Sequence, residues 1–138
     1  MKPEAIFIPV AVLALWTQLV AFITGVTRVR AARAGRVSPG AFKFGESPEV
    51  PDDVAVVNRN LMNLLELPVL FYVVVFGFYV TRHAGPGIVW LSSVYVALRL
   101  VHSVIHLTSN RIIPRLTVFT ASNVVLLTMW LRFLRRVI

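Results

Sequence analysis

The sequence contains no cysteine and few charged residues. Of its 138 residues only 14% are charged, and 6 acidic residues stand against 14 basic ones. The absence of cysteine excludes a disulfide framework, a thiolate metal site and a cysteine nucleophile. Charged residues make up about a quarter of a typical soluble domain. The low charge content therefore argues against a soluble protein.

Hydrophobic residues, in contrast, make up 57% of the chain. This content excludes disorder, and a soluble unit of this length cannot bury so much apolar surface. The composition predicts an integral membrane protein. The net charge of +8 is also found in nucleic-acid binders, but here the basic stretches lie between long apolar runs. We interpret them as loops that face anionic lipid headgroups, and we expect no nucleic-acid partner.

Four apolar segments are each long enough to cross a membrane as a helix, which takes about 20 residues. They cover residues 5–27, 54–82, 88–108 and 116–134. The first segment carries no charge, and its length favours a retained helix over a signal peptide. The sequence thus predicts one all-α domain over residues 1–138, an integral membrane bundle of four transmembrane helices running up and down.

The one substantial loop, residues 28–53, joins the first two segments and contains several glycines and prolines that interrupt a helix. An even number of spans places both chain ends on the other side of the membrane. Seven basic residues fall on the loop side and five on the side of the chain ends. Because basic loops tend to stay inside, we expect the loop in the cytoplasm, and we expect the membrane to be a bacterial inner membrane.

Ionisable residues inside the second and third segments are the first candidates for a functional site, because a charge near the bilayer centre costs about 2.5–3.5 kcal/mol. These polar residues are Arg59, Asn63 and Glu66 in the second segment, and Arg99, His102 and His106 in the third. Their spacings, i, i+4, i+7 and i, i+3, i+7, place each set on one helix face. On consecutive antiparallel helices the two faces can meet, with Arg115 near the same end.

Several explanations of these residues stay open. Glu66 and Arg99 fall at similar depths and could form a buried ion pair that only fixes the helix register. His102 and His106 share a helix face and could bind a metal, but Glu66 is the only nearby carboxylate for a third ligand. We therefore expect no metal site.

The charges of this cluster suggest a class of ligand. Arginine side chains match carboxylates, and a lone glutamate matches an ammonium group, so the complement is a small zwitterion with more than one carboxylate. Glutathione fits this description, and the chemistry would then be activation of its thiol to the thiolate. Charge matching alone does not select glutathione over other anions.

Two stretches resemble signature motifs of one membrane-protein family. Residues 59–66, RNLMNLLE, resemble the R-x-x-x-N-x-x-E signature of the MAPEG family, the membrane-associated proteins in eicosanoid and glutathione metabolism. Residues 99–106, RLVHSVIH, resemble its second signature, often R-x-x-Y/H-x-x-x-Y, on the third helix. The resemblance extends over essentially the whole chain and favours a bacterial member similar to the microsomal glutathione transferases.

The resemblance implies a homotrimer in which glutathione, as co-substrate, binds between neighbouring subunits near the cytoplasmic side. The residues that it implies for glutathione binding are Arg59, Asn63, Glu66, Arg99, His102 and His106. Arg115 stands where family members place the arginine that stabilises the thiolate. His106 is our candidate for the group that accepts the thiol proton.

Members of the family conjugate glutathione to lipophilic electrophiles, reduce lipid hydroperoxides or isomerise lipid endoperoxides. We accordingly expect a glutathione transferase or peroxidase that acts on a lipophilic small molecule in the bilayer. The chain has histidine at both 102 and 106, where the better-known enzymes often have tyrosine in at least the second position. The alternatives are a catalytically silent binding or scaffold protein of the same fold, and a transporter, which four unbroken helices make less favoured.

Overall fold

The computed structural model describes residues 2–43 and 47–138, and these residues contain helices but no strands. Residues 44–46 of the predicted first loop lie outside the described residues. The helices are η1 (Pro3–Ile6) and η2 (Pro39–Phe42), both short 3-10 helices, and α1 (Phe7–Arg33), α2 (Asp52–Leu65), α3 (Pro68–Val80), α4 (Pro86–Leu107) and α5 (Ile112–Val137).

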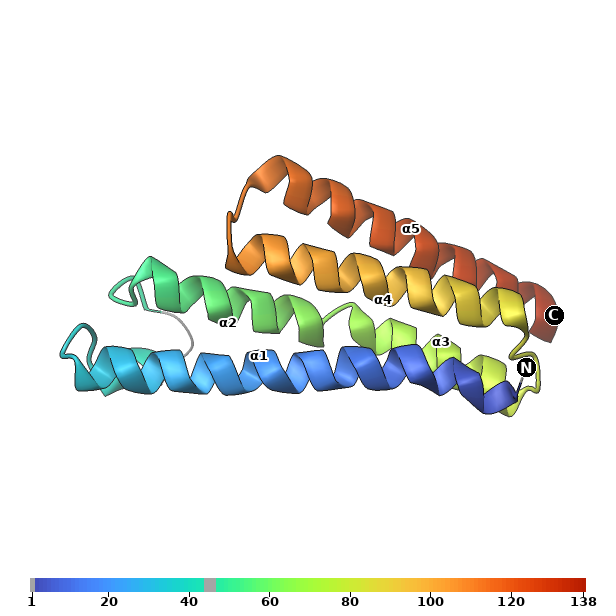
Figure 1. Cartoon of the computed structure of the whole chain (residues 1–138), viewed down its shortest axis with the longest axis horizontal. Helices are drawn as coiled ribbons and strands as arrows, with labels where there is room; N and C mark the ends of the chain where they lie inside the picture. The colour runs from blue at the N-terminus through green and yellow to red at the C-terminus, as the bar shows by residue number, and fades with distance from the viewer. Residues whose placement is uncertain (1, 44–46) are drawn as a thin grey trace.

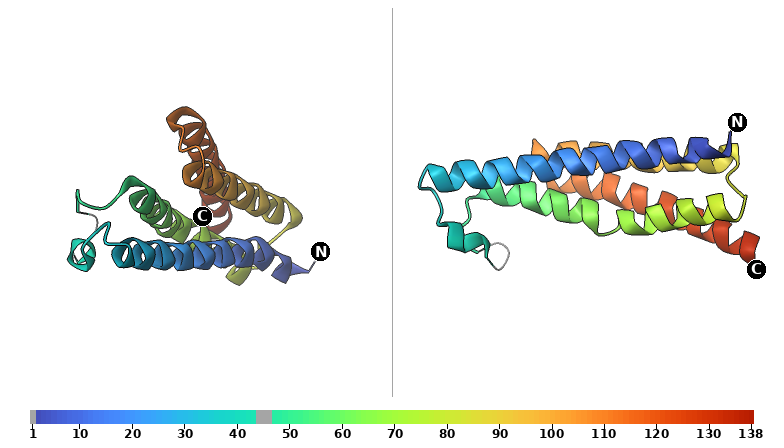
Figure 2. Two further views of the ribbon diagram at one scale, coloured as in Figure 1. Left: turned by 60° about the vertical axis from the view of Figure 1, so that its left-hand side comes forward. Right: turned by 90° about the horizontal axis from the view of Figure 1, so that it is seen from below.

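Four stretches of these helices are long and apolar enough to cross a membrane. They are Pro3–Arg33, Asp52–Val80, Pro86–Leu107 and Ile112–Val137, so α2 and α3 together form the second span. The spans run up and down in one bundle, with both chain ends at one end and the α1–α2 and α4–α5 connections at the other (Figure 1). The views in Figure 2 show the same order of helices. The predicted all-α membrane bundle with four spans is confirmed.

The second span is divided into two helices, whereas the sequence predicted one helix over residues 54–82. α2 ends at Leu65 and α3 begins at Pro68. Proline lacks an N–H for the bond to residue i−4, and its ring clashes with that carbonyl. The backbone therefore leaves the helical conformation at Glu66, with φ −80° and ψ −89°. This correction also removes the argument against a transporter that depended on unbroken helices.

The first helix is longer than predicted and includes part of the predicted loop. α1 continues to Arg33, so the basic residues at its end lie where the helix dipole favours positive charge. Arg28 Nη2 donates a hydrogen bond to Asn58 Oδ1 at 2.7 Å, which ties α1 to α2. Arg36 and Asp53 form an exposed ion pair of 2.6 Å across the connection. The hydrogen bond with Asp53 raises the pKa of the Arg36 guanidinium, which keeps it charged.

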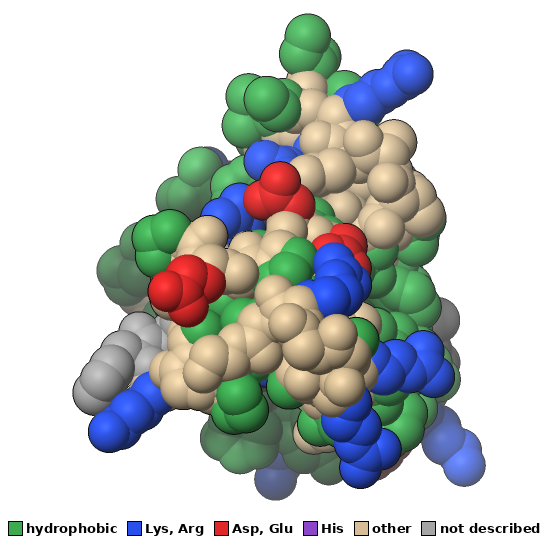
Figure 3. Space-filling model, turned by 90° about the vertical axis from the view of Figure 1, so that its left-hand side faces the viewer, with side chains coloured by type: hydrophobic (Ala, Val, Ile, Leu, Met, Phe, Trp, Pro, Cys, Tyr) green, Lys and Arg blue, Asp and Glu red, His purple; other side chains and the backbone are tan. Residues whose placement is uncertain are grey.

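The core follows the middle of the bundle, while apolar side chains also cover much of its outside. The rings of Phe71 and Tyr95, both fully buried, stack with their centroids 4.6 Å apart. Large side chains such as Leu15 and Phe22 remain exposed on α1, as expected for a surface that lipid or another subunit covers. Figure 3 looks onto the end with the α1–α2 connection, where charged side chains spread over the end and hydrophobic ones cover the flanks behind it.

Candidate functional site

A groove of about 520 Å³ opens between α2 and the α4–α5 turn, at the end of the bundle opposite the chain termini. We call it the α2–α5 groove. Predicted site residues make up much of its lining: Arg59, Asn63, Glu66, His106 and Arg115. The remaining lining residues are Val56, Asn58, Met62 and Asn110. The structure therefore brings together residues that the two signatures and the fourth segment contribute separately.

A smaller pocket of about 200 Å³ adjoins this groove and shares Asn63, His106 and Arg115 with it. It adds His102 and an apolar wall on α5. That wall consists of Ile112, Leu116 and Phe119. Ile112 is 70% and Leu116 59% exposed on the outside of the bundle. The polar groove thus continues into a pocket whose far side is open to the bilayer.

Helix α2 presents the first polar set to the groove, as its spacing predicted. Asn63 Nδ2 donates to the backbone carbonyl of Arg59 at 2.8 Å, one turn earlier. The side chains of Arg59 and Glu66 are exposed in the single chain. Glu66 is the residue at which the helix breaks. Both charged side chains of this set are therefore accessible at the groove.

Arg99 differs from the other predicted residues because it is fully buried and lines neither the groove nor the smaller pocket. Its Nη2 donates to the backbone carbonyl of Asn63, close to the helix break. Its guanidinium lies 5.5 Å from the centre of the Phe119 ring. We infer that Arg99 positions Asn63 and the break, and its contact with glutathione stays a prediction.

The ion pair between Glu66 and Arg99, which the sequence left open as an alternative, does not form in this structure. The ion pair of the α1–α2 connection, Arg36–Asp53, involves neither residue. The break after Leu65 is the reason: Glu66 becomes exposed, and a backbone carbonyl takes its place as the partner of Arg99. One arm of the guanidinium is thereby paired within the chain, while Nε and Nη1 of Arg99 are buried without a hydrogen-bond partner.

Arg115 is held at the junction of α4 and α5. Its Nη1 donates to Asn110 Oδ1 at 2.5 Å, and lies 3.4 Å from His106 Nε2. Asn110 ends α4 with a left-handed backbone, φ +46°, which asparagine tolerates. Its N–H bonds to the carbonyl of Ile105 at 2.8 Å. α5 begins at Ile112 and not near Leu116, because Pro114 falls in the first turn, where its missing N–H is not needed.

The two histidines face each other on α4, with ring centroids 5.8 Å apart. Both are buried, and the His102 ring lies 5.5 Å from the ring of Phe119. Across residues 2–43 and 47–138 no group of three histidine, cysteine, aspartate or glutamate residues lies close enough to hold a metal ion. The histidine pair therefore has no third ligand in this part of the chain.

Sequence reasoning missed the residues that hold the site together. Ser103 Oγ accepts hydrogen bonds from Trp16 Nε1 at 2.8 Å and from Asn60 Nδ2 at 2.7 Å, which joins α1, α2 and α4. Asn60 and Ser103 lie inside the two signature stretches, and this position in the sequence could have identified them as residues of the site. Asn110 carried only the signal of an asparagine just after a helix, and Trp16 carried none.

Comparison with known proteins gives one result. The sequence model of the MAPEG family matches residues 6–135 of the chain. No curated protein and no solved structure matches the chain. The matched residues include both signature stretches and every residue that lines the α2–α5 groove.

Proposed function

Because the chain belongs to the MAPEG family, we propose that it is a membrane enzyme that uses glutathione on a lipophilic substrate, as a transferase or peroxidase. The family includes such enzymes and also members without catalytic activity. The observation that carries the proposal is the α2–α5 groove, which gathers two arginines, one carboxylate, several amides and an imidazole.

The groove complements glutathione in charge and in size. Glutathione has two carboxylates and one ammonium group. Arg59 matches a carboxylate and Glu66 matches the ammonium group. Amide side chains beside them supply donors and acceptors for its peptide groups. The groove volume of about 520 Å³ falls within the range that small-molecule sites usually have.

Activation of the thiol follows from the contact between Arg115 and His106. Arginine stays protonated at any accessible pH and cannot accept a proton, so its part is to stabilise the negative sulfur. The N-terminal turn of α5, where Arg115 lies, adds partial positive charge. The thiol proton moves to His106 Nε2, 3.4 Å from Arg115 Nη1. The new imidazolium and Arg115 repel each other, and a thiolate in contact with both offsets that repulsion.

The second substrate approaches from the bilayer along the apolar wall of α5. Ile112, Leu116 and Phe119 line the smaller pocket next to His106 and Arg115. In a transferase reaction the thiolate sulfur forms a bond to the electrophilic carbon, and the leaving group departs with the bonding electrons. A lipophilic electrophile dissolved in the membrane can reach this wall without crossing water.

The test is glutathione affinity of the detergent-solubilised protein, with Arg59→Ala as the variant. Loss of a charge-assisted contact should weaken binding by about tenfold or more. Arg111→Ala is the matched control, since Arg111 is exposed at the same end but does not line the groove. Equal affinity of Arg59→Ala and the unaltered protein would contradict the site.

Turnover distinguishes an enzyme from a silent binder. We expect the protein to release chloride from a chlorinated nitrobenzene in the presence of glutathione, with formation of the thioether. Binding of glutathione without turnover of this substrate or of a lipid hydroperoxide would leave the alternative, a binding or scaffold protein with the same fold.

We also propose that the chain assembles as a homotrimer, with the groove facing a neighbouring subunit. The exposed carboxylate of Glu66 within a membrane span supports this, because a neighbour can supply its polar partner. The detergent-solubilised complex should have three times the 15.4 kDa mass of one chain. A protein mass of one chain under conditions that preserve glutathione binding would contradict the trimer.

A further inference from the structure

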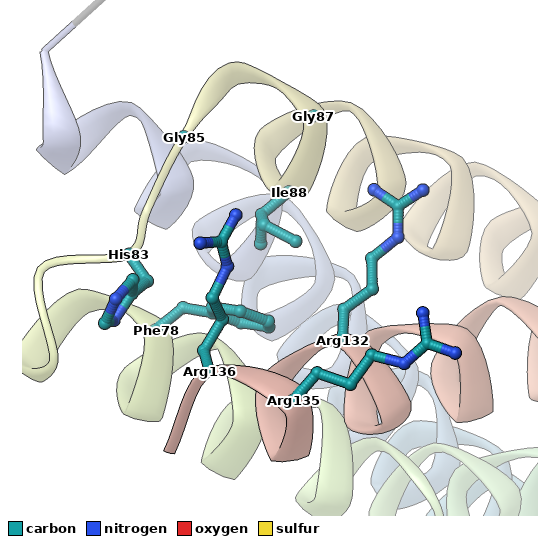
Figure 4. A pocket seen from close by; sticks show the side chains of 8 residues that line it. All are labelled: Phe78, His83, Gly85, Gly87, Ile88, Arg132, Arg135 and Arg136. Carbon is teal, nitrogen blue, oxygen red and sulfur yellow. The ribbon is translucent and has the colours of Figure 1, made fainter. Parts of the chain in front are cut away.

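A second pocket lies at the other end of the bundle, next to the chain termini. It has a volume of about 580 Å³ and is lined by residues from the end of α5, the α3–α4 turn and the start of α4. Its lining consists of Phe78, His83, Gly85, Gly87, Ile88, Arg132, Arg135 and Arg136 (Figure 4). We call it the terminal pocket. None of these residues is acidic, so the pocket carries positive charge without internal compensation.

Two of the three arginines of the terminal pocket extend toward the start of α4. Figure 4 shows Arg132 and Arg136 extending from α5 toward the turn that contains Gly85 and Gly87. A Cβ on Gly87 would lie 3.8 Å from Arg132 Nη1, so the guanidinium lies against the first turn of α4. That turn begins at Gly85, which has no side chain to cap its N–H groups. Two sources of positive charge, the arginine side chains and the helix end, thus surround one space.

The position of His83 is fixed by the end of α3. Arg82 has a left-handed backbone, φ +60°, and the N–H of His83 bonds to the carbonyl of Phe78 at 2.8 Å. This bond across the helix end is the Schellman arrangement. The N–H of Gly85 bonds in turn to the carbonyl of His83 at 2.9 Å. The wall of the pocket is therefore a hydrogen-bonded turn.

The three arginines are not occupied by other groups of the protein. Within the described part of the chain none of them has a hydrogen bond or ion pair to another residue. Their guanidinium groups are exposed, and water at a membrane surface can solvate them. The repulsion between these adjacent like charges nevertheless remains uncompensated. An anion in the pocket would supply the missing compensation.

Aromatic side chains indicate that the terminal pocket lies at the level of the lipid headgroups. Trp90 in α4, Trp130 in α5 and Tyr79 in α3 all lie within two turns of it along their helices. Tryptophan and tyrosine collect at the membrane–water boundary. Leu131 and Leu134, interleaved with the arginines on α5, are about half exposed and present apolar surface beside the charges.

We propose that the terminal pocket binds the phosphate group of an anionic membrane phospholipid, in the leaflet on the side of the chain termini. The guanidinium groups of Arg132 and Arg136 match phosphate oxygens. The exposed leucines beside them favour a lipid over free phosphate, because acyl chains can pack along α5 below the headgroup. This site lies at the opposite end from the α2–α5 groove and does not depend on glutathione binding.

The experiment compares lipid binding by the detergent-solubilised protein and by the variant Arg132→Gln/Arg136→Gln, measured by native mass spectrometry. The probes are phosphatidylglycerol, which is anionic, and phosphatidylcholine, which is zwitterionic. We expect the protein to prefer phosphatidylglycerol and the variant to bind it about tenfold more weakly. The matched control is Arg30→Gln/Arg33→Gln on α1, which removes two positive charges at the other end and should leave binding unchanged.

Two results would overturn the proposal. One is equal binding of phosphatidylglycerol by the double variant and the control. The other is displacement of the lipid by inorganic phosphate at concentrations like those of the lipid itself, which would make the ligand a soluble anion. Unchanged glutathione affinity and thermal midpoint of the double variant show that the loss is local. If the double variant is unstable, the single variants Arg132→Gln and Arg136→Gln give the same comparison.

Discussion

The two ends of the bundle both concentrate arginine, but they surround it with different chemistry. The α2–α5 groove sets Arg59 and Arg115 beside a carboxylate, several amides and an imidazole. The terminal pocket sets three arginines beside a histidine and apolar residues, with no acidic residue in its lining. Mixed charges suit a zwitterion, and uniform positive charge suits a simple anion. One basic composition thus supports two kinds of binding site.

The arginines also differ in how they are held. At the groove end the protein fixes them: Arg99 bonds to the carbonyl of Asn63, and Arg115 bonds to Asn110. At the terminal end the described residues provide no such partners for Arg132, Arg135 and Arg136. Preorganised charge stabilises a developing thiolate without reorganisation. Exposed charge without a partner in the protein is sufficient to attract a headgroup.

The largest expected effect tests this difference through stability. Arg99→Ala removes a hydrogen bond from a charged donor, which contributes about 1.5–3 kcal/mol, and leaves a cavity under Phe119. Arg132→Ala removes an exposed side chain and should change the free energy of unfolding by at most about 0.5 kcal/mol. Thermal midpoints of the two variants in the same detergent check the prediction.

Arg99→Lys serves as the control for charge in that experiment. It keeps a positive donor but loses the second arm of the guanidinium, so its midpoint should fall between that of Arg99→Ala and the unaltered protein. Equal midpoints for Arg99→Ala and Arg132→Ala would show that the two ends hold their arginines alike, and the comparison would fail.

The sequence predicted the four spans and much of the site because both depend on periodicity. Apolar length defined the spans, and helical spacing placed Arg59, Asn63 and Glu66 on one face. The partner of Arg99 could not be predicted this way. Which carbonyl or carboxylate meets a buried arginine depends on how two helices pack and on the break before Pro68, and a one-dimensional pattern does not contain that information.

The terminal pocket was missed for a related reason. The basic end of the fourth segment was visible in the sequence, but basic residues at a helix end are usual in membrane proteins. The pocket exists because α5 returns beside the α3–α4 turn and brings Arg132 against Gly87. Similarly, the bond from Arg115 to Asn110 depends on the left-handed backbone of Asn110, which only the folded turn defines.

The smallest expected effect separates the contribution of the hydrogen bond between Arg115 and Asn110 from that of the charge of Arg115. Asn110→Gly removes the Oδ1 that Arg115 contacts at 2.5 Å, and glycine accepts the φ of +46° without strain. Arg115 would then be as unconstrained as the arginines of the terminal pocket. Glutathione should still bind, but a smaller fraction of it should be thiolate. We expect the thiolate fraction to drop by about two- to threefold. This corresponds to a change of less than one pKa unit in the bound thiol, which would be about 1.4 kcal/mol.

Thiolate absorbance in the ultraviolet, on titration of the purified protein with glutathione, measures that fraction. Arg115→Ala gives the largest loss of thiolate to be expected, because it removes the charge itself. It should return the pKa of the bound thiol toward its ordinary value of about 8.5. Asn110→Asp keeps an acceptor for Arg115 but adds a negative charge beside it, and it should retain less thiolate than Asn110→Gly. Asn110→Gly and the unaltered protein could give the same thiolate signal while Arg115→Ala loses it. The charge of Arg115 would then be sufficient to stabilise the thiolate, and its hydrogen bond to Asn110 would contribute nothing.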